Sequence, residues 1–90
     1  MHYVTAVRFS GGETEDCITS VRWLNATDGV AGTSNVGEMV AWIDKGNALY
    51  VAGPNGRVRV GVVRPEGKAP YLRAYANKQW IDNLRELPRL

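Results

Sequence analysis

The hydrophobic positions of the chain follow a helical period in one stretch only, residues 34–46. Val36, Met39, Val40 and Ile43 stand at i, i+3, i+4 and i+7, which places them in one apolar stripe of a helix. A helix of about three turns cannot bury such a stripe alone, so flanking strands must supply the other half of the core. We therefore expect the stripe to be buried.

The ends of this helix also have sequence signals. Asn35, followed three positions later by Glu38, has the pattern of a capping box. Gly46 can adopt the left-handed conformation that ends a helix, and Lys45 in the last turn complements the helix dipole. Asp44 and Lys45 are expected in water.

Period-two alternation and β-forming residues predict strands in most of the remaining chain. They cover residues 3–9, 17–24, 30–33, 48–52, 57–63 and 71–75, and a short last segment holds Trp80 and Ile81. Leu84 and Leu87 predict one helical turn that Pro88 ends. These patterns predict an α+β fold: a single twisted, mostly antiparallel β-sheet of about five or six strands with one main α-helix packed on one face.

Two loops have contrasting chemistry. Gly53-Pro54-Asn55-Gly56 predicts a tight hairpin between strands 48–52 and 57–63, because proline presets one turn residue and Asn-Gly accepts positive φ. The acidic run 13–16 is interpreted as a solvated hairpin loop, with a metal site as the weaker alternative.

Composition bounds the class of protein. Ninety residues form one domain, 1–90, and 44% hydrophobic with 22% charged residues is ordinary for a folded protein. A net charge of +2 excludes a chain that binds polyanions along its whole surface. Cys17 is the single cysteine and permits no internal disulfide, which favours a cytoplasmic location. Neither a signal peptide nor a membrane span is indicated.

Four segments resemble a catalogued family of small bacterial proteins, domain-of-unknown-function family 3892. They are Tyr-Val-Thr-Ala-Val-Arg at 3–8, Ile-Thr-Ser-Val-Arg-Trp at 18–23, Glu-Met-Val-Ala-Trp-Ile at 38–43, and Asp82-Asn83-Leu84 with Leu87-Pro88. The resemblance covers nearly the whole chain and implies a compact single-domain bacterial protein. It transfers no active-site residue, because each segment is a packing or turn element.

The candidates for catalysis are few. His2 is the only histidine, and its place beside the first residue predicts a frayed or surface position. Cys17 is interpreted as a small apolar filler. A pairing of Cys17 with His2 is conceivable, but nothing in the sequence marks a third orienting group or an oxyanion hole. The carboxylates show no close pair, and no Cys/His cluster or phosphate loop is present. We expect no enzyme, no metal site and no cofactor; an enzyme centred on Cys17 is the least favoured hypothesis.

One constellation suggests binding. If Val58, Val60 and Val62 point at the helix, an opposite face can gather arginines and tyrosines: Arg8, Arg22, Arg57, Arg59, Tyr71, Arg73 and Tyr75. Such a face could bind single-stranded nucleic acid by phosphate contacts and base stacking. It could equally be a solvated or protein-contact face, in which arginine stems lie along tyrosine rings. Trp23, Trp42 and Trp80 are interpreted as core packing rather than a ligand cage.

These observations favour a non-enzymatic binding module that acts through protein–protein contact or as a homodimer. Accessory subunits and the small inhibitors of bacterial, phage or plasmid origin, anti-defence proteins included, act in this way. The alternative is a nucleic-acid-binding protein that uses the Arg/Tyr face. No membrane partner and no small-molecule substrate is indicated.

Overall fold

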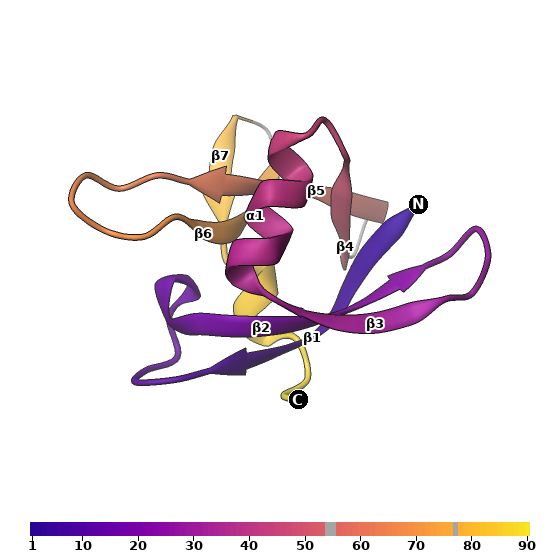
Figure 1. Ribbon diagram of the computed structural model, residues 1–90, viewed down its shortest axis with the longest axis horizontal. Coiled ribbons are helices and arrows are strands. Elements are labelled where there is room, and N and C mark those ends of the chain that lie inside the picture. The colour runs from indigo at the N-terminus through magenta and orange to yellow at the C-terminus, as the bar shows by residue number, and fades with distance from the viewer. Residues whose placement is uncertain (54–55, 77) are drawn as a thin grey trace.

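The computed structural model describes residues 1–53, 56–76 and 78–90. Its elements are β1 (His2–Phe9), η1 (Glu15–Cys17), β2 (Ile18–Asn25), β3 (Ala31–Asn35), α1 (Val36–Asp44), β4 (Leu49–Gly53), β5 (Gly56–Val63), β6 (Tyr71–Ala76), β7 (Gln79–Ile81) and η2 (Asn83–Glu86), where η marks a short 3-10 helix (Figure 1). The α+β class is confirmed, and each expected strand is present with its ends shifted by at most two residues.

The described residues form one sheet of seven strands in the order β3-β2-β1-β4-β5-β6-β7, where the sequence predicted about five or six. The additional strand is β7, the short segment with Trp80 and Ile81, which pairs with β6 over three residues. Neighbouring strands are antiparallel except β1 and β4, which are parallel. The sheet is therefore mostly antiparallel, as expected.

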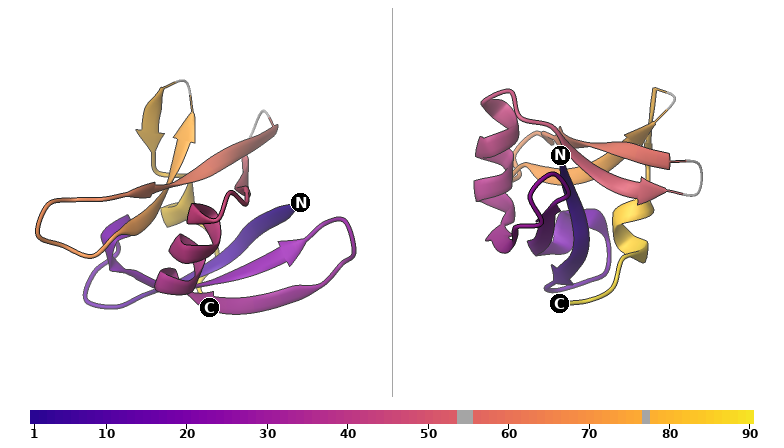
Figure 2. Two further views of the ribbon diagram at one scale, coloured as in Figure 1. Left: turned by 45° about the horizontal axis from the view of Figure 1, so that its top comes forward. Right: turned by 90° about the vertical axis from the view of Figure 1, so that its right-hand side faces the viewer.

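The parallel pair is short and divides the sheet. β1 and β4 pair only through His2 with Leu49 and Tyr3 with Tyr50. Beyond this point the pairing of β1 with β2 is irregular between Val4 and Ala6, and such irregularities bend a strand. Figure 2 shows β1, β2 and β3 running beneath β4 to β7 rather than beside them. The two parts of the sheet thus form two layers.

The predicted capping box starts α1. Asn35 Oδ1 accepts the Glu38 backbone N–H at 2.8 Å, and Glu38 Oε1 accepts the Asn35 N–H at 3.1 Å. Lys45 follows the last helical residue, and Gly46 has φ +98°, a conformation that favours glycine. The helix is two residues shorter at each end than the stretch that predicted it, because residues 34 and 35 belong to β3 and the final pair forms the stop.

The stripe of α1 faces the core. Val36, Met39 and Val40 are buried, as predicted, but Ile43 is half-buried and packs at the margin of the core. The helix contacts β2, β3, β5 and β6, so it lies across the open side of both layers, whereas the sequence predicted it on one face of a single twisted sheet.

The core is closed on another side by η2. Leu84, in the predicted helical turn, is fully buried, and η2 contacts β1, β4 and β6. In the right-hand view of Figure 2, η2 and α1 lie on opposite sides of the molecule with strands between them. The largest fully buried side chains come from both layers and include Leu49, Leu72 and Val21.

The two predicted loops have different outcomes. The interpretation of residues 13–16 as a solvated loop is wrong at Glu15, which begins η1 and is only 5% exposed. In the predicted hairpin, the pairing of β4 with β5 extends as far as Gly53 opposite Gly56, as expected. Pro54 and Asn55, the central turn residues, lie outside the described residues.

None of the helices in the described part of the chain has the length and apolar character needed to cross a membrane.

Candidate binding surface

Four side chains from four neighbouring strands form a row on the solvent face of β4 to β7. Tyr50 pairs with Arg59, Arg59 with Tyr75, and Tyr75 with Trp80. Directly paired residues project to the same face of a sheet. Val60, the next residue along β5, is buried on the opposite face, so the row faces solvent. We call Tyr50, Arg59, Tyr75 and Trp80 the outer row.

The aromatic end of the outer row is exposed. The rings of Tyr75 and Trp80 meet edge to face, with centroids 5.0 Å apart. Such a pair contributes roughly 0.5 to 1.5 kcal/mol beyond its buried area, yet the two side chains remain 40% and 39% exposed. A Cβ on Gly61 would lie 3.0 Å from Trp80 Cη2. The glycine therefore lets the indole lie against β5.

The other end of the row is basic. The guanidinium carbons of Arg57 and Arg59 lie 4.8 and 6.0 Å from the ring centre of Tyr50, within cation–π distance. Arg57 Nη1 also lies 3.0 Å from Met1 Sδ. The Tyr50 ring thus orders two arginines whose side chains remain exposed.

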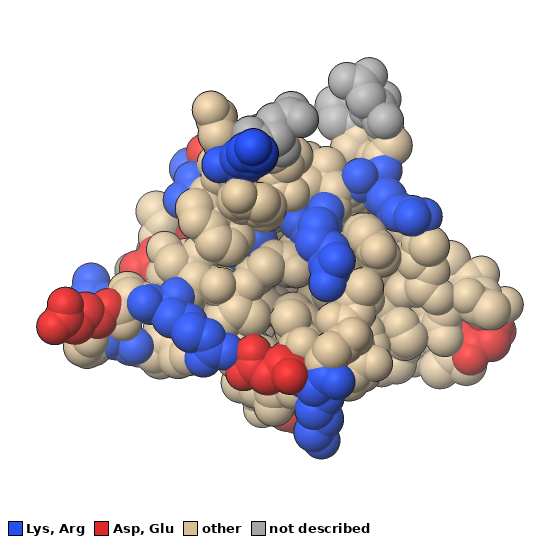
Figure 3. Space-filling model, turned by 90° about the horizontal axis from the view of Figure 1, so that it is seen from above, with Lys and Arg blue, Asp and Glu red and all other residues tan. Residues whose placement is uncertain are grey.

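Charge on this face is of one sign. β4, β5, β6 and β7 together contain three arginines and no Asp or Glu, and Lys78 precedes β7. Figure 3 shows Lys and Arg side chains over the middle of this surface, with Asp and Glu toward its margins. The face therefore suits a partner with negative potential.

The third of these arginines, Arg73, is held within the protein. Its Nη2 lies 2.8 Å from Asp82 Oδ1, its Nε donates to the Ile81 carbonyl at 3.4 Å, and its Nε lies 3.8 Å from Glu15 Oε2. These contacts connect η1 to β6 and to the segment after β7, and Arg73 is only 30% exposed. Arg73 therefore links these segments of the protein to one another.

Glu15 and Asp82 form a carboxyl pair although they lie far apart in the sequence. Burial raises the pKa of Glu15, and the neighbouring Asp82 carboxylate raises it further. The hydrogen bond with Glu15 lowers the pKa of Asp82, and Arg73 adds to this effect. Glu15 Oε2 accepts no hydrogen bond in the described part of the chain. Glu15 is thus the group that holds a proton more readily, while Asp82 stays ionised.

Comparison with known proteins places the chain in a family. The family model described as "Protein of unknown function (DUF3892)" matches residues 3–88. The chain belongs to the DUF3892 family. This confirms the resemblance seen in the sequence. No curated protein and no solved structure matches the chain.

The structure of this DUF3892 chain separates the seven residues that the sequence grouped on one face. Arg57, Arg59 and Tyr75 lie together on the solvent face of β5 and β6. Tyr71 and Arg73 share the parity of Tyr75, but η1 and the residues after β7 approach β6 beside Arg73.

The remaining two arginines, Arg8 and Arg22, are in the layer of the DUF3892 chain that β1, β2 and β3 form. Register places Arg8 beside Ser20 of β2, and Arg22 between Ala6 of β1 and Thr33 of β3. The predicted single twisted sheet put all seven residues on one face, whereas the short β1–β4 pairing divides the sheet into two layers.

Two members of the outer row, Trp80 and Tyr50, were not among the seven residues that the sequence grouped on one face. The interpretation of Trp80 as core packing is wrong, since its side chain is exposed. Tyr50 could have been found from the predicted hairpin, because pairing Gly53 with Gly56 brings Tyr50 opposite Arg59.

His2 and Cys17 do not form a pair in the DUF3892 chain. His2 pairs with Asn25 at one end of the β1–β2 hairpin, whereas Cys17 immediately precedes β2 at the other end. Seven residues of extended chain separate these ends by about 20 Å. The expectation that His2 is frayed is also wrong, since it lies in β1 and is half-buried.

The Glu15 carboxyl group should make stability depend on pH. Its folded pKa is raised above the usual 4.5, so its stabilising contribution is present below 4.5 and is lost as the pH rises through the folded value. Glu15→Gln imitates the protonated form. We expect the variant to unfold at higher urea concentration than the parent at neutral pH, with a flatter dependence on pH above 4.5.

Urea midpoints measured from pH 4.5 upward test this expectation, and Glu13→Gln in the same loop is the matched exposed control. Asp82 affects stability in a separate pH range. Because its pKa is lowered in the folded protein, its stabilising contribution is lost only as the pH falls below 3.8, the usual pKa of an aspartate. Equal pH profiles for Glu15→Gln and the parent would contradict the assignment.

Proposed function

We propose that this protein is a non-enzymatic binding module whose outer row contacts an acidic surface of a protein partner. The observation that carries the proposal is the exposed Tyr75–Trp80 pair beside Arg59. Trp, Tyr and Arg are the residue types that most often dominate the energy of protein interfaces. Apolar side chains that lie together on an exposed surface often mark a site of protein interaction.

The distribution of arginines favours protein over nucleic acid. Arg73 is bound internally, and Arg8 and Arg22 lie in the other layer, so the exposed arginines at the outer row are Arg59, a member of it, and the neighbouring Arg57. Two phosphate contacts would give a salt dependence with a log–log slope of only about 1.4 for a single strand. A protein interface does not require a longer row of basic residues, because its binding energy is concentrated in a few central residues.

The same charge argues against a homodimer through this face. A two-fold interface brings the same patch of both copies together. Arg57 and Arg59 would then face their own copies across strands that supply no carboxylate. Like charges in apposition disfavour such a pairing, so a partner of different sequence with acidic residues fits the face better.

The proposal predicts a strong effect of Trp80→Ala on partner binding. Capture from a lysate of the source organism, with parent and Trp80→Ala baits compared, would identify proteins that need the outer row. With one such partner in hand, Trp80→Ala should weaken binding by about 2 kcal/mol or more, roughly 30-fold in Kd. Isothermal titration measures this directly.

Tyr75→Ala and Tyr71→Ala form a matched pair for the same titration. Both tyrosines lie on β6 with the same parity, but only Tyr75 belongs to the outer row. Tyr75→Ala should weaken binding and Tyr71→Ala should leave it nearly unchanged. Saturable binding of a short oligonucleotide with a Kd below about 1 μM at physiological salt, tighter than typical non-specific affinity, would instead favour the nucleic-acid function.

A further inference from the structure

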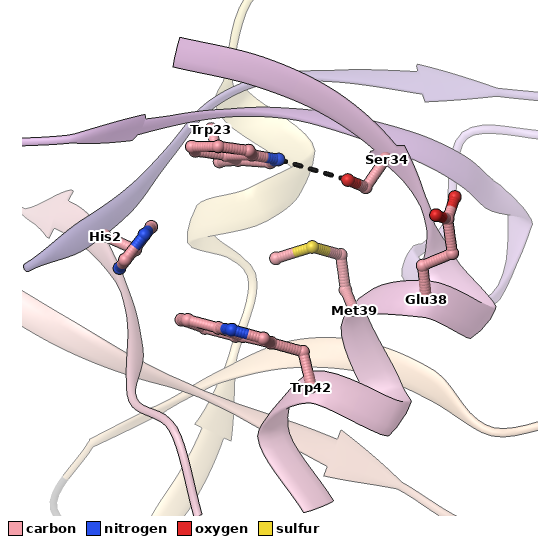
Figure 4. Close-up of a pocket in the computed structure, with 6 residues that line it drawn as sticks. All are labelled: His2, Trp23, Ser34, Glu38, Met39 and Trp42. Atoms are coloured by element: carbon pink, nitrogen blue, oxygen red, sulfur yellow. Dashed lines mark hydrogen bonds between the residues drawn. The ribbon is translucent and has the colours of Figure 1, made fainter. Parts of the chain in front are cut away.

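A second concave site lies between the first three strands and α1, away from the outer row. Its cavity volume is about 280 Å³, and its lining is His2, Trp23, Ser34, Glu38, Met39 and Trp42. Figure 4 shows the indole rings of Trp23 and Trp42 one above the other, with His2 closing one side and Met39 the other. Three aromatic rings therefore surround one small space.

The rings are held in place by their surroundings. Trp23 Nε1 donates to Ser34 Oγ at 3.1 Å, and the same indole lies directly over Gly32, where a Cβ would come within 2.6 Å of Trp23 Cζ2. The His2 ring is 5.5 Å from that of Trp23 and 4.8 Å from that of Trp42, tilted against both. The cage is formed before any ligand arrives, which lowers the entropic cost of binding.

The potential in the cavity favours a cation. Each aromatic face presents the negative side of its quadrupole, and tryptophan is the strongest of these partners. Glu38 adds a carboxylate to the lining, whose Oε1 caps α1. The lining contains no Lys or Arg. The Glu38 carboxylate would repel an anionic ligand there.

We propose that this cavity binds a methylated ammonium group. Such a cation is weakly hydrated, fits between indole faces and gains from a carboxylate at the margin. The group can belong to a free small molecule of the choline type or to a methylated lysine side chain of a protein. The site shares no residue with the outer row and does not depend on the function proposed for that face.

The first test uses tetramethylammonium as the probe and tryptophan emission as the readout. The proposal predicts a saturable change in emission. Choline should bind about tenfold more tightly than 3,3-dimethylbutanol, its neutral isostere, because only the cation interacts with the quadrupoles and the carboxylate. Equal binding of the two would make the cavity a plain apolar cleft, and an unsaturable response would also overturn the proposal.

Two substitutions separate charge from shape. Glu38→Gln removes the carboxylate but keeps the capping box, since glutamine can also accept the Asn35 N–H. It should weaken choline binding about two- to fivefold, whereas Glu66→Gln, on an exposed loop, should not. Trp42→Leu keeps an apolar side chain without a π face and should weaken binding about tenfold or more.

The source of the cation is decided by comparing three ligands: free choline, a short peptide with trimethyllysine, and the same peptide with unmodified lysine. Tighter binding of the methylated peptide than of choline assigns the site to a protein side chain, and the reverse order assigns it to a small molecule. Equal affinity for the methylated and unmodified peptides would overturn the proposal, since the strongly hydrated primary ammonium should be the weaker ligand.

Discussion

Leu84→Ala is expected to lower the free energy of unfolding by about 2 to 5 kcal/mol, the range for truncating a fully buried leucine. Leu84 has no exposed surface, and η2, which carries it, contacts β1, β4 and β6. Its removal should leave a cavity where the two layers meet. The total free energy of unfolding of a domain of this size is only about 5 to 15 kcal/mol. Each kcal/mol lost lowers the midpoint of thermal unfolding by about 4 to 8 °C.

Leu90→Ala is the matched control for this experiment. The side chain of Leu90 is 38% exposed, and its backbone N–H donates to the Val7 carbonyl at 2.9 Å, a bond that alanine retains. The same chemical change should therefore cost less than about 1 kcal/mol. Similar losses for the two variants, measured by urea unfolding, would show that η2 does not close the core.

Gly32→Ala is expected to destabilise the protein by about 1 to 3 kcal/mol, the usual cost of forcing atoms into a packed site. The new methyl group would lie 2.6 Å from Trp23 Cζ2 and 3.0 Å from Trp23 Cε2, so the indole must move. Displacement of the ring also breaks its hydrogen bond to Ser34, which contributes about 1 kcal/mol. Urea unfolding and the emission spectrum of the folded state should both change.

Gly37→Ala makes the same change where there is room. Its added methyl group would lie 3.4 Å from Asn35 Oδ1, an ordinary contact, in the first turn of α1. Alanine is the better helix former by up to about 1 kcal/mol, so this variant should be slightly more stable than the parent. A loss of stability at Gly37 as large as at Gly32 would mean that backbone freedom, not the Trp23 ring, determines the effect.

Local elements were largely predictable because their causes are local. The capping box at Asn35 and Glu38 needs only a spacing of three residues, and the β4–β5 hairpin needs only its Gly-Pro-Asn-Gly turn and alternating flanks. The helical turn at Leu84 likewise followed from a short apolar pattern before a proline. Each signal lies within a few residues and requires no knowledge of the rest of the fold.

The candidate sites were less predictable, because each depends on which strands become neighbours. Arg57, Arg59 and Tyr75 were correctly grouped, since β5 and β6 are adjacent and their parity is visible in the sequence. Arg73 was grouped with them, but its partners Asp82 and Glu15 come from distant segments. Alternation indicates which face of a strand a residue occupies, but not what covers that face.

The sequence by itself determined most of the secondary structure, the α+β class and the buried stripe of α1, because periodicity and turn chemistry act over short distances. Only the tertiary structure decided the strand order, the two-layer shape and the sites. The parallel pairing of β1 with β4 is two residues long and has no local signature, yet it places His2 near Trp42 and separates Arg8 and Arg22 from Arg59. Such long-range pairing is selected by burial of the whole core, which is a property of the complete chain.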